Sequence, residues 1–176
     1  MMSSTLKRMA DYKKLKPFIL KWEGDFSNHP KDKGGATNKG ITIATFRSVF
    51  GKDKTVADLK NMTDSEWDYI FKKYFWDRWQ ADKIDCQSVA NILVDWVWAS
   101  GKYGITIPQE LLSVQPDGIV GVQTLTALNN QNSKEFFDKV KKRRLEYCLR
   151  IVKNDTKQKV FLQGWQNRIN AIKFCQ

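Results

Sequence analysis

Apolar residues along the first part of this 176-residue chain recur at the spacing of an α-helix. Leu15, Phe18, Ile19 and Trp22 stand at positions i, i+3, i+4 and i+7, which is the stripe of an amphipathic helix. Gly24, two residues after Trp22, is of the residue type at which helices commonly end. The pattern predicts a first helix over about residues 6–22.

Further helical stripes follow, several of them introduced by a capping signal. Thr42 precedes a short stripe that stops at Gly51, and Thr63 forms a capping box with Glu66. A central helix is expected over 88–101, a long helix from 132 or 133, and a last helix with apolar residues at 161, 165, 169 and 172. Gly164 in the last helix predicts a close helix crossing, because glycine there costs about 1 kcal/mol relative to alanine.

Strand signals are short and sparse. Phe26-Ser27 and Ile41-Thr42 predict at most one small β-hairpin, so the expected fold class is mainly α. No internal repeat, low-complexity segment or linker rich in proline, glycine or serine divides the chain. We therefore expect two lobes, 1–103 and 104–176, that pack together.

Carboxylates and glycines gather directly after the first helix. Glu23 falls in its last turn, where the negative end of the helix dipole and the apolar neighbour Trp22 disfavour a charged acid. A glutamic acid that keeps its proton near neutral pH can act as a general acid. Asp32 and Thr37 follow nine and fourteen residues later, in a glycine-rich connection. Glycoside hydrolysis uses such a set, although an exposed glutamate and a turn-stabilising aspartate are the plainer alternative.

The residues around this cluster also match a family pattern. The matching residues are Glu23-Gly24-Asp25, Phe26, Asn28-His29-Pro30, Asp32, Gly34-Gly35-Ala36-Thr37-Asn38 and Gly40-Ile41-Thr42. This segment resembles N-acetylmuramidases of glycoside hydrolase family 108, and its order of Glu, Asp and Thr is similar to that of phage-type lysozymes. Asp25 stands in place of the family's second glycine, and His29 in place of its first acid.

The resemblance implies a fold, a reaction and a set of site residues. The fold would be lysozyme-like, with the hairpin beside a cleft between the Glu23 end of the first helix and the Asp95 helix. The reaction would be hydrolysis of the bond between N-acetylmuramic acid and N-acetylglucosamine, with Glu23 as general acid, Asp32 as second acid and Thr37 placing water or the transition state. The expected substrate-binding residues are Asn28, Gly35, Asn38, Asp95, Ser100, Gly101 and Tyr103. Neither a metal nor a cofactor is expected.

The second half of the chain carries a motif of its own. Asp117-Gly118 with Gly121 and Thr124 resembles the Asp-Gly-x-x-Gly-x-x-Thr turn of peptidoglycan-binding modules. A turn that merely connects two helices and a contact with the glycan are equal alternatives here. The family's closing signature is similar to Phe161-Leu162-x-Gly164-Trp165-x-Asn167-Arg168, so the resemblance extends over residues 14–174.

Charge narrows the class of partner. The formal net charge of +11 at pH 7 favours an anionic partner such as nucleic acid, acidic lipid or cell wall. Together with the family resemblance, this charge makes the glycan strands of peptidoglycan, in an anionic cell wall, the expected partner. The protein itself is expected to be a monomer. No nucleic-acid-binding motif is present, and no apolar run would span a membrane. A solvated helix face is the commoner explanation of the basic run Lys139, Lys141, Lys142, Arg143, Arg144, Arg150, Lys153, Lys157 and Lys159.

The predicted function is that of an endolysin-like peptidoglycan hydrolase. No signal peptide is recognisable at the N-terminus, so we expect synthesis in the cytoplasm and action on the wall after release or non-Sec export. The three cysteines have no metal-like spacing and suit free thiols. The alternatives are a lytic transglycosylase, in which one glutamate serves as acid and then base, and a wall-binding protein without catalysis. A nucleic-acid binder is supported by charge and aromatic residues alone.

Overall fold

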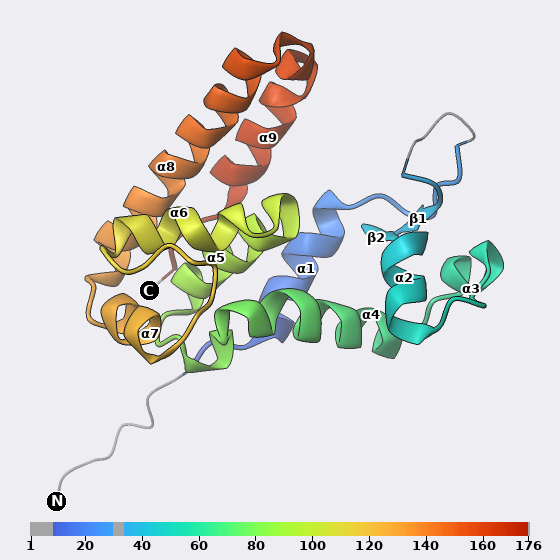
Figure 1. Ribbon diagram of the computed structural model, residues 1–176, viewed down its shortest axis with the longest axis horizontal. Helices are drawn as coiled ribbons and strands as arrows, with labels where there is room; N and C mark the ends of the chain where they lie inside the picture. The colour runs from blue at the N-terminus through green and yellow to red at the C-terminus, as the bar shows by residue number, and fades with distance from the viewer. Residues whose placement is uncertain (1–8, 30–33, 176) are drawn as a thin grey trace, which may run out of the picture. The chain divides into compact units, whose positions relative to one another are not determined.

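The computed structural model describes residues 9–29 and 34–175, and it confirms the predicted mainly α, lysozyme-like fold (Figure 1). In this part of the chain, none of the helices is long and apolar enough to cross a membrane. The strands are β1 (Thr37–Asn38) and β2 (Ile41–Thr42). The α-helices are α1 (Tyr12–Trp22), α2 (Ile43–Phe50), α3 (Val56–Lys60), α4 (Asp64–Phe71), α5 (Gln87–Ser100), α6 (Tyr103–Leu111), α7 (Val122–Asn129), α8 (Ser133–Asn154) and α9 (Lys159–Ala171).

The described residues form two compact units. The small unit is Lys13–Tyr74, and the large unit comprises residues 9–12 with 75–175. A π-helical turn, Lys72–Trp76, and the short 3₁₀ turns Asp77–Trp79 and Ala81–Lys83 connect α4 to α5, and a further 3₁₀ turn, Thr156–Gln158, connects α8 to α9. This division differs from the expected lobes 1–103 and 104–176, which stay a prediction.

Helix α1 begins at Tyr12, later than the predicted start near residue 6. The residues just before it are held by the large unit. The backbone N–H of Ala10 donates to the carbonyl of Ile84 at 3.0 Å, and that of Asp11 donates to the side chain of Gln87 at 2.8 Å. These bonds keep the backbone out of the helical conformation. Pro17 lies inside the helix.

The small β-hairpin exists, but the predicted pairing of its strands was wrong. Ile41–Thr42 pairs with Thr37–Asn38 and not with Phe26–Ser27. The two connecting residues, Lys39 and Gly40, have φ values of 48° and 80°, and a two-residue hairpin turn of this kind requires positive φ at both positions. Ser27 instead forms a bridge with Thr37 through two backbone hydrogen bonds of 2.8 Å.

The predicted helix starts at Thr42 and Thr63 are confirmed. The Thr42 hydroxyl accepts from the backbone N–H of Thr45 at 3.1 Å. Thr63 and Glu66 form the complete capping box, with bonds of 3.1 and 2.8 Å. Asn132 caps α8 by accepting from the N–H of Glu135 at 3.0 Å. Each cap satisfies an N–H group that would otherwise lack a partner in the first helical turn.

The close helix crossing lies at Gly104, so its prediction at Gly164 was wrong. A Cβ atom on Gly104 would lie 2.5 Å from the backbone nitrogen of Val97, which shows how closely α6 crosses α5. The indole N–H of Trp79 donates to the Gly104 carbonyl at 3.0 Å. Gly164 is exposed, and a Cβ atom there would meet nothing within 4 Å.

The two glycines give a paired prediction of stability. Gly164→Ala should raise the free energy of unfolding by about 1 kcal/mol, because alanine loses less backbone entropy in a helix and has room here. Gly104→Ala should lower it, because the methyl group collides with the backbone of α5. Urea unfolding followed by circular dichroism measures both changes. A loss of stability in Gly164→Ala would mean that α9 packs more tightly at this position.

Candidate active site

The predicted general acid lies at the end of α1 in the small unit. Helix α1 ends at Trp22, and the backbone N–H of Glu23 still donates to the carbonyl of Ile19 at 3.1 Å. The Glu23 side chain is half-buried, and one and two turns before it Ile19 and Leu15 are buried. The carboxyl group is therefore carried by a rigid element and is reachable from solvent.

Helix α4 fixes the helix that carries Glu23. The ammonium group of Lys16 lies 3.1 Å from a carboxylate oxygen of Asp64 and 2.6 Å from one of Asp68. It also lies 5.5 Å from the ring centre of Trp67. Burial lowers the pKa of Lys16, but the hydrogen bonds to the two carboxylates outweigh it and raise the pKa above the ordinary value. The lysine therefore stays charged and ties α1 to α4.

The same helix α4, together with α3, fixes the hairpin. The indole N–H of Trp67 donates to the carbonyl of Lys39 at 3.0 Å, directly at the turn. The amide of Asn38 donates to the carbonyl groups of Leu59 at 2.9 Å and Lys60 at 3.2 Å. Asn38 is only 6% exposed, so it holds the hairpin in place and has little surface to offer a glycan. It is best described as a positioning residue.

Thr37 comes to the site on strand β1. Its backbone is occupied by the bridge to Ser27, whereas its half-buried hydroxyl makes no hydrogen bond with any residue that the structure describes. Gly35 has a φ of +71°, which only glycine adopts without strain, and Asn28 is exposed. Asp32 lies outside the described residues. Glu23, Asn28, Gly35 and Thr37 thus share the small unit, in the bend between α1 and β1.

Asp95 belongs to the large unit, where it is fully buried between two arginines. One carboxylate oxygen accepts from Arg168 at 2.8 Å. The other lies 2.8 Å from Arg144, an ion pair whose alignment falls short of a hydrogen bond. The three residues come from α5, α8 and α9, so the cluster joins these helices. With no exposed surface, Asp95 is placed as a structural residue and not as a glycan contact.

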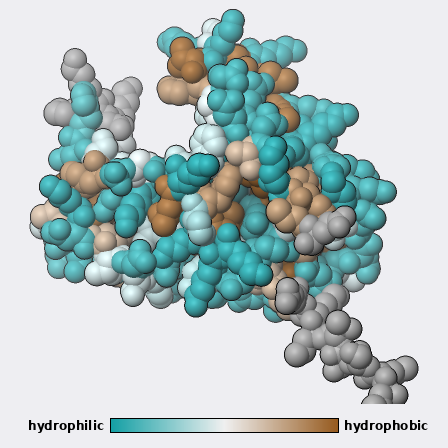
Figure 2. Space-filling model, turned by 180° about the vertical axis from the view of Figure 1, so that it is seen from behind, coloured by the Kyte–Doolittle hydropathy of each residue, from teal (hydrophilic) through white to brown (hydrophobic). Residues whose placement is uncertain are grey.

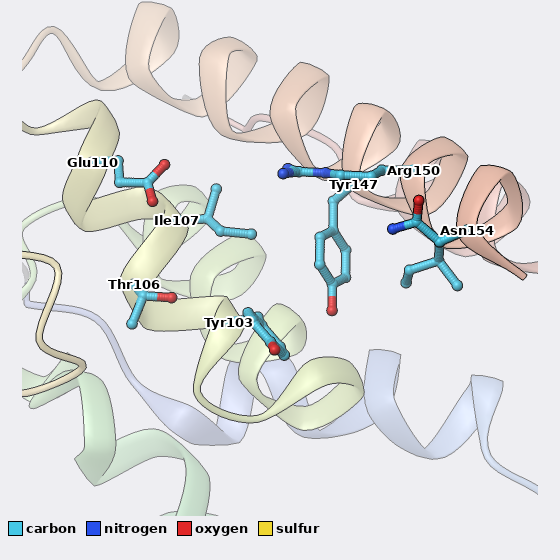
Figure 3. A pocket seen from close by; sticks show the side chains of 8 residues that line it. Tyr103, Thr106, Ile107, Glu110, Tyr147, Arg150 and Asn154 are labelled. Carbon is cyan, nitrogen blue, oxygen red and sulfur yellow. The ribbon is translucent and has the colours of Figure 1, made fainter.

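Another predicted site residue of the large unit lies at a groove between α6 and α8 (Figure 3). Tyr103 lines it and is 58% exposed, with its ring centre 5.7 Å from that of Tyr147. Ser100 hydrogen-bonds the side chain of Tyr147, and burial raises the pKa of Tyr147 above its ordinary value. Gly101 ends α5 with a φ of +56°. Because its pKa is raised, the Tyr147 hydroxyl stays protonated near neutral pH.

Part of the basic run in the second half makes contacts within the protein. In the basic run, Lys141 donates to the Ile172 carbonyl, Arg143 pairs with Glu110 at 2.9 Å, and Arg144 is buried against Asp95. The exposed basic residues of the run are Lys139, Lys142, Arg150, Lys153, Lys157 and Lys159. Only these six are exposed, so the prediction of a solvated helix face can apply to them alone and stays a prediction.

The Asp117-Gly118 turn is organised by a buried glutamine that the sequence did not single out. The Gln109 amide donates to the Asp117 carboxylate at 3.2 Å and to the Ile119 carbonyl at 3.0 Å, and its oxygen accepts from the N–H of Gly118 at 2.9 Å. A hydrogen bond from the Ile119 N–H lowers the pKa of Asp117. These bonds favour the interpretation of the motif as a helix connector.

Several positioning residues escaped the sequence analysis, among them Lys16, Trp67 and Gln109. Lysine, tryptophan and glutamine at such positions give no local signal, because their partners lie on other elements. In the part of the chain that is described, His, Cys, Asp and Glu side chains form no group of three that would suit a metal ion. The three cysteines are all free, and burial raises the pKa of Cys148.

Two segments of the chain match known protein families. Residues 16–101 match the family described as Glycosyl hydrolase 108, and residues 103–170 match the one described as Predicted Peptidoglycan domain. No curated protein matches the chain. It is similar to the solved structure of Brucella abortus SagA, with 27% identity, a TM-score of 0.79, and 92% of this chain and 90% of that chain covered. Residues 16–101 belong to the glycosyl hydrolase 108 family, and together the two matching segments describe a glycosidase directed at peptidoglycan.

Proposed function

We propose that the enzyme is an N-acetylmuramidase that hydrolyses the bond between N-acetylmuramic acid and N-acetylglucosamine in peptidoglycan. The observation that supports this most is the position of Glu23. Its reachable carboxyl group is carried at the end of α1, and α4 fixes both this helix and the turn of the hairpin that carries Thr37. A general acid must be held in a fixed orientation toward the leaving oxygen.

In this proposal each residue of the small unit has a distinct role. Glu23 protonates the glycosidic oxygen as the bond to the muramic acid carbon breaks. The Thr37 hydroxyl, which has no hydrogen bond to the described residues, holds the attacking water. Asp32 serves as the second carboxylate, which activates that water or stabilises the oxocarbenium-like transition state. The water oxygen ends on the muramic acid carbon, and the proton from Glu23 ends on N-acetylglucosamine.

Analysis of the products tests the bond that is cleaved. Purified sacculi are digested, the new ends are reduced with borohydride, and the fragments are identified by mass spectrometry. A muramidase yields reduced muramic acid at the new ends. Reduced glucosamine would instead identify a glucosaminidase, and 1,6-anhydromuramic acid would identify a lytic transglycosylase. Pelleting with sacculi but no release of fragments would identify a wall-binding protein without catalysis.

Exposed lysines at the end of the α8–α9 hairpin should contribute to wall binding. Figure 2 shows hydrophilic and hydrophobic surface side by side on this hairpin. Replacing Lys153, Lys157 and Lys159 together by glutamine should weaken pelleting with anionic sacculi and reduce its salt dependence, because exposed charges are screened beyond about 8 Å at physiological ionic strength.

A matched triple variant provides the control for charge. Lys14→Gln, Lys52→Gln and Lys139→Gln also remove three exposed positive charges, but from elsewhere on the described surface. Pelleting by this control should change less than pelleting by the hairpin variant, in a co-sedimentation assay over a range of salt concentrations. Equal losses in both variants would show that only the net charge matters. No loss in either variant would show that electrostatic attraction does not contribute to wall binding.

A further inference from the structure

The groove between α6 and α8 has the composition of a binding site. Its volume is about 370 Å³, within the range of small-molecule sites. Figure 3 shows Tyr103, Thr106 and Glu110 projecting from α6 toward Tyr147, Arg150 and Asn154 of α8. All of these residues belong to the large unit.

The aromatic part of the groove offers a surface for a sugar ring. Tyr103 exposes more than half of its side chain although it lies within 5.7 Å of a second tyrosine ring, at an interplanar angle of 39°. An amphipathic aromatic ring suits the apolar face of a sugar, with its hydroxyl available to the polar edge. Tyr147 is packed against the buried Trp96, with ring centres 5.8 Å apart at an interplanar angle of 60°. The platform is therefore partly preorganised.

The charged part of the groove favours a carboxylate. Glu110 already has a cationic partner, because the Arg143 guanidinium lies 2.9 Å from its carboxylate. No described residue forms an ion pair or hydrogen bond with the exposed Arg150 guanidinium. An unpaired guanidinium binds a carboxylate through two parallel hydrogen bonds. The neutral hydrogen-bonding groups of Thr106 and Asn154 complete the lining.

We propose that this groove binds an N-acetylated sugar that carries a carboxylate-bearing substituent, with the sugar ring on Tyr103 and Tyr147 and the carboxylate on Arg150. In a glycan strand, muramic acid is the sugar with such a substituent. The carboxylate is that of its lactyl group, or that of the stem peptide where the lactyl group is amidated. The inference rests on the proposed function, and it places recognition of muramic acid in the segment that matches the Predicted Peptidoglycan domain.

The test compares two disaccharides that differ in the lactyl group. N-acetylglucosaminyl-N-acetylmuramic acid carries a carboxylate, whereas N,N′-diacetylchitobiose, here called chitobiose, does not. Each is titrated into the Glu23→Gln protein, which excludes turnover, and binding is followed by NMR. The muramic acid disaccharide should bind more tightly, and Arg150→Gln should weaken it about tenfold, roughly the loss of one charge-assisted contact. Chitobiose binding should be nearly unchanged in that variant.

Two further variants separate charge from stacking. Lys139→Gln removes one exposed positive charge from the same helix outside the groove and should leave the preference for muramic acid intact. Tyr103→Ala should weaken both disaccharides and leave their ratio unchanged. The inference is overturned if Arg150→Gln keeps the full preference, or if neither disaccharide shifts the signals of Tyr103, Tyr147 and Arg150.

The source of the carboxylate and the proposed function are tested separately. If the stem peptide is recognised, a muramyl dipeptide whose stem bears a free carboxylate should also bind in an Arg150-dependent way. If this dipeptide binds more weakly than unsubstituted muramic acid, the lactyl group is the part that is recognised. Digestion of sacculi by the Arg150→Gln enzyme should still yield the same new ends, only more slowly at low substrate. If digestion of sacculi does not yield reduced muramic acid, the proposed function is wrong. The proposal about the groove is then tested by the binding measurements alone.

Discussion

Replacing Glu23 by glutamine should reduce the rate of sacculus digestion by about 10²- to 10⁴-fold, because a general acid contributes this much and glutamine has no proton to give. The fold should survive, since the side chain is half-buried and keeps its size. Turbidity loss of purified sacculi measures the rate, and circular dichroism checks the fold.

The control for this variant is Glu146→Gln, the same change at an exposed glutamate on α8 that makes no hydrogen bond or ion pair with the described residues. Its activity should remain close to that of the unmodified enzyme. Asp32→Asn should also reduce activity, but less than Glu23→Gln, because solvent partly replaces a stabilising carboxylate. Unchanged activity and an unchanged fold in Glu23→Gln would show that Glu23 is not the general acid.

Replacing Asp95 by alanine should lower the free energy of unfolding by about 3–5 kcal/mol, the largest stability effect that we expect from a single change. Removing one partner of a buried ion pair leaves the other charge buried without compensation. Here the change leaves both Arg144 and Arg168, which are themselves largely buried, without their carboxylate partner. Urea unfolding measures the loss.

The matched control is Asp138→Ala, which breaks an ion pair with Lys134 on the surface of α8. Both of those side chains are more than half exposed, so this change should cost no more than about 1 kcal/mol. If Asp95→Ala costs as little as Asp138→Ala, the buried cluster does not stabilise the large unit, and an external role for Asp95 would have to be considered again.

Elements with local signals were predictable from the sequence. The starts of α2 and α4 follow from threonine caps, because the cap and the N–H group that it satisfies lie within three residues of one another. The end of α2 at Gly51 follows from the same kind of local rule. The mainly α class needed only the spacing of apolar residues.

Features that depend on distant partners were predicted poorly. The first strand of the hairpin was assigned to Phe26–Ser27, because nothing in the short runs of residues distinguished it from Thr37–Asn38. Gly164 and Gly104 are equally plausible crossing points until the neighbouring helix is known. Arg144 was included in a solvated basic run although its partner, Asp95, lies on another helix.

The candidate site was predicted in part for the same reason. The motif around Glu23 and Thr37 is continuous in sequence, so the resemblance placed both residues, and the structure puts them in one unit. Whether a residue contacts ligand or holds the scaffold depends on burial, which a single sequence does not give. Asn38 and Asp95, expected among the glycan contacts, are buried and fully engaged with other parts of the chain.

Digestion of sacculi in water enriched with ¹⁸O tests the central claim most directly. Hydrolysis by the proposed mechanism places one oxygen from water on the muramic acid carbon of each cleaved bond. The new ends, reduced at once with borohydride to prevent exchange, should therefore be reduced muramic acid that carries the heavy isotope. Unlabelled 1,6-anhydromuramic acid, or label on reduced glucosamine, would contradict the account.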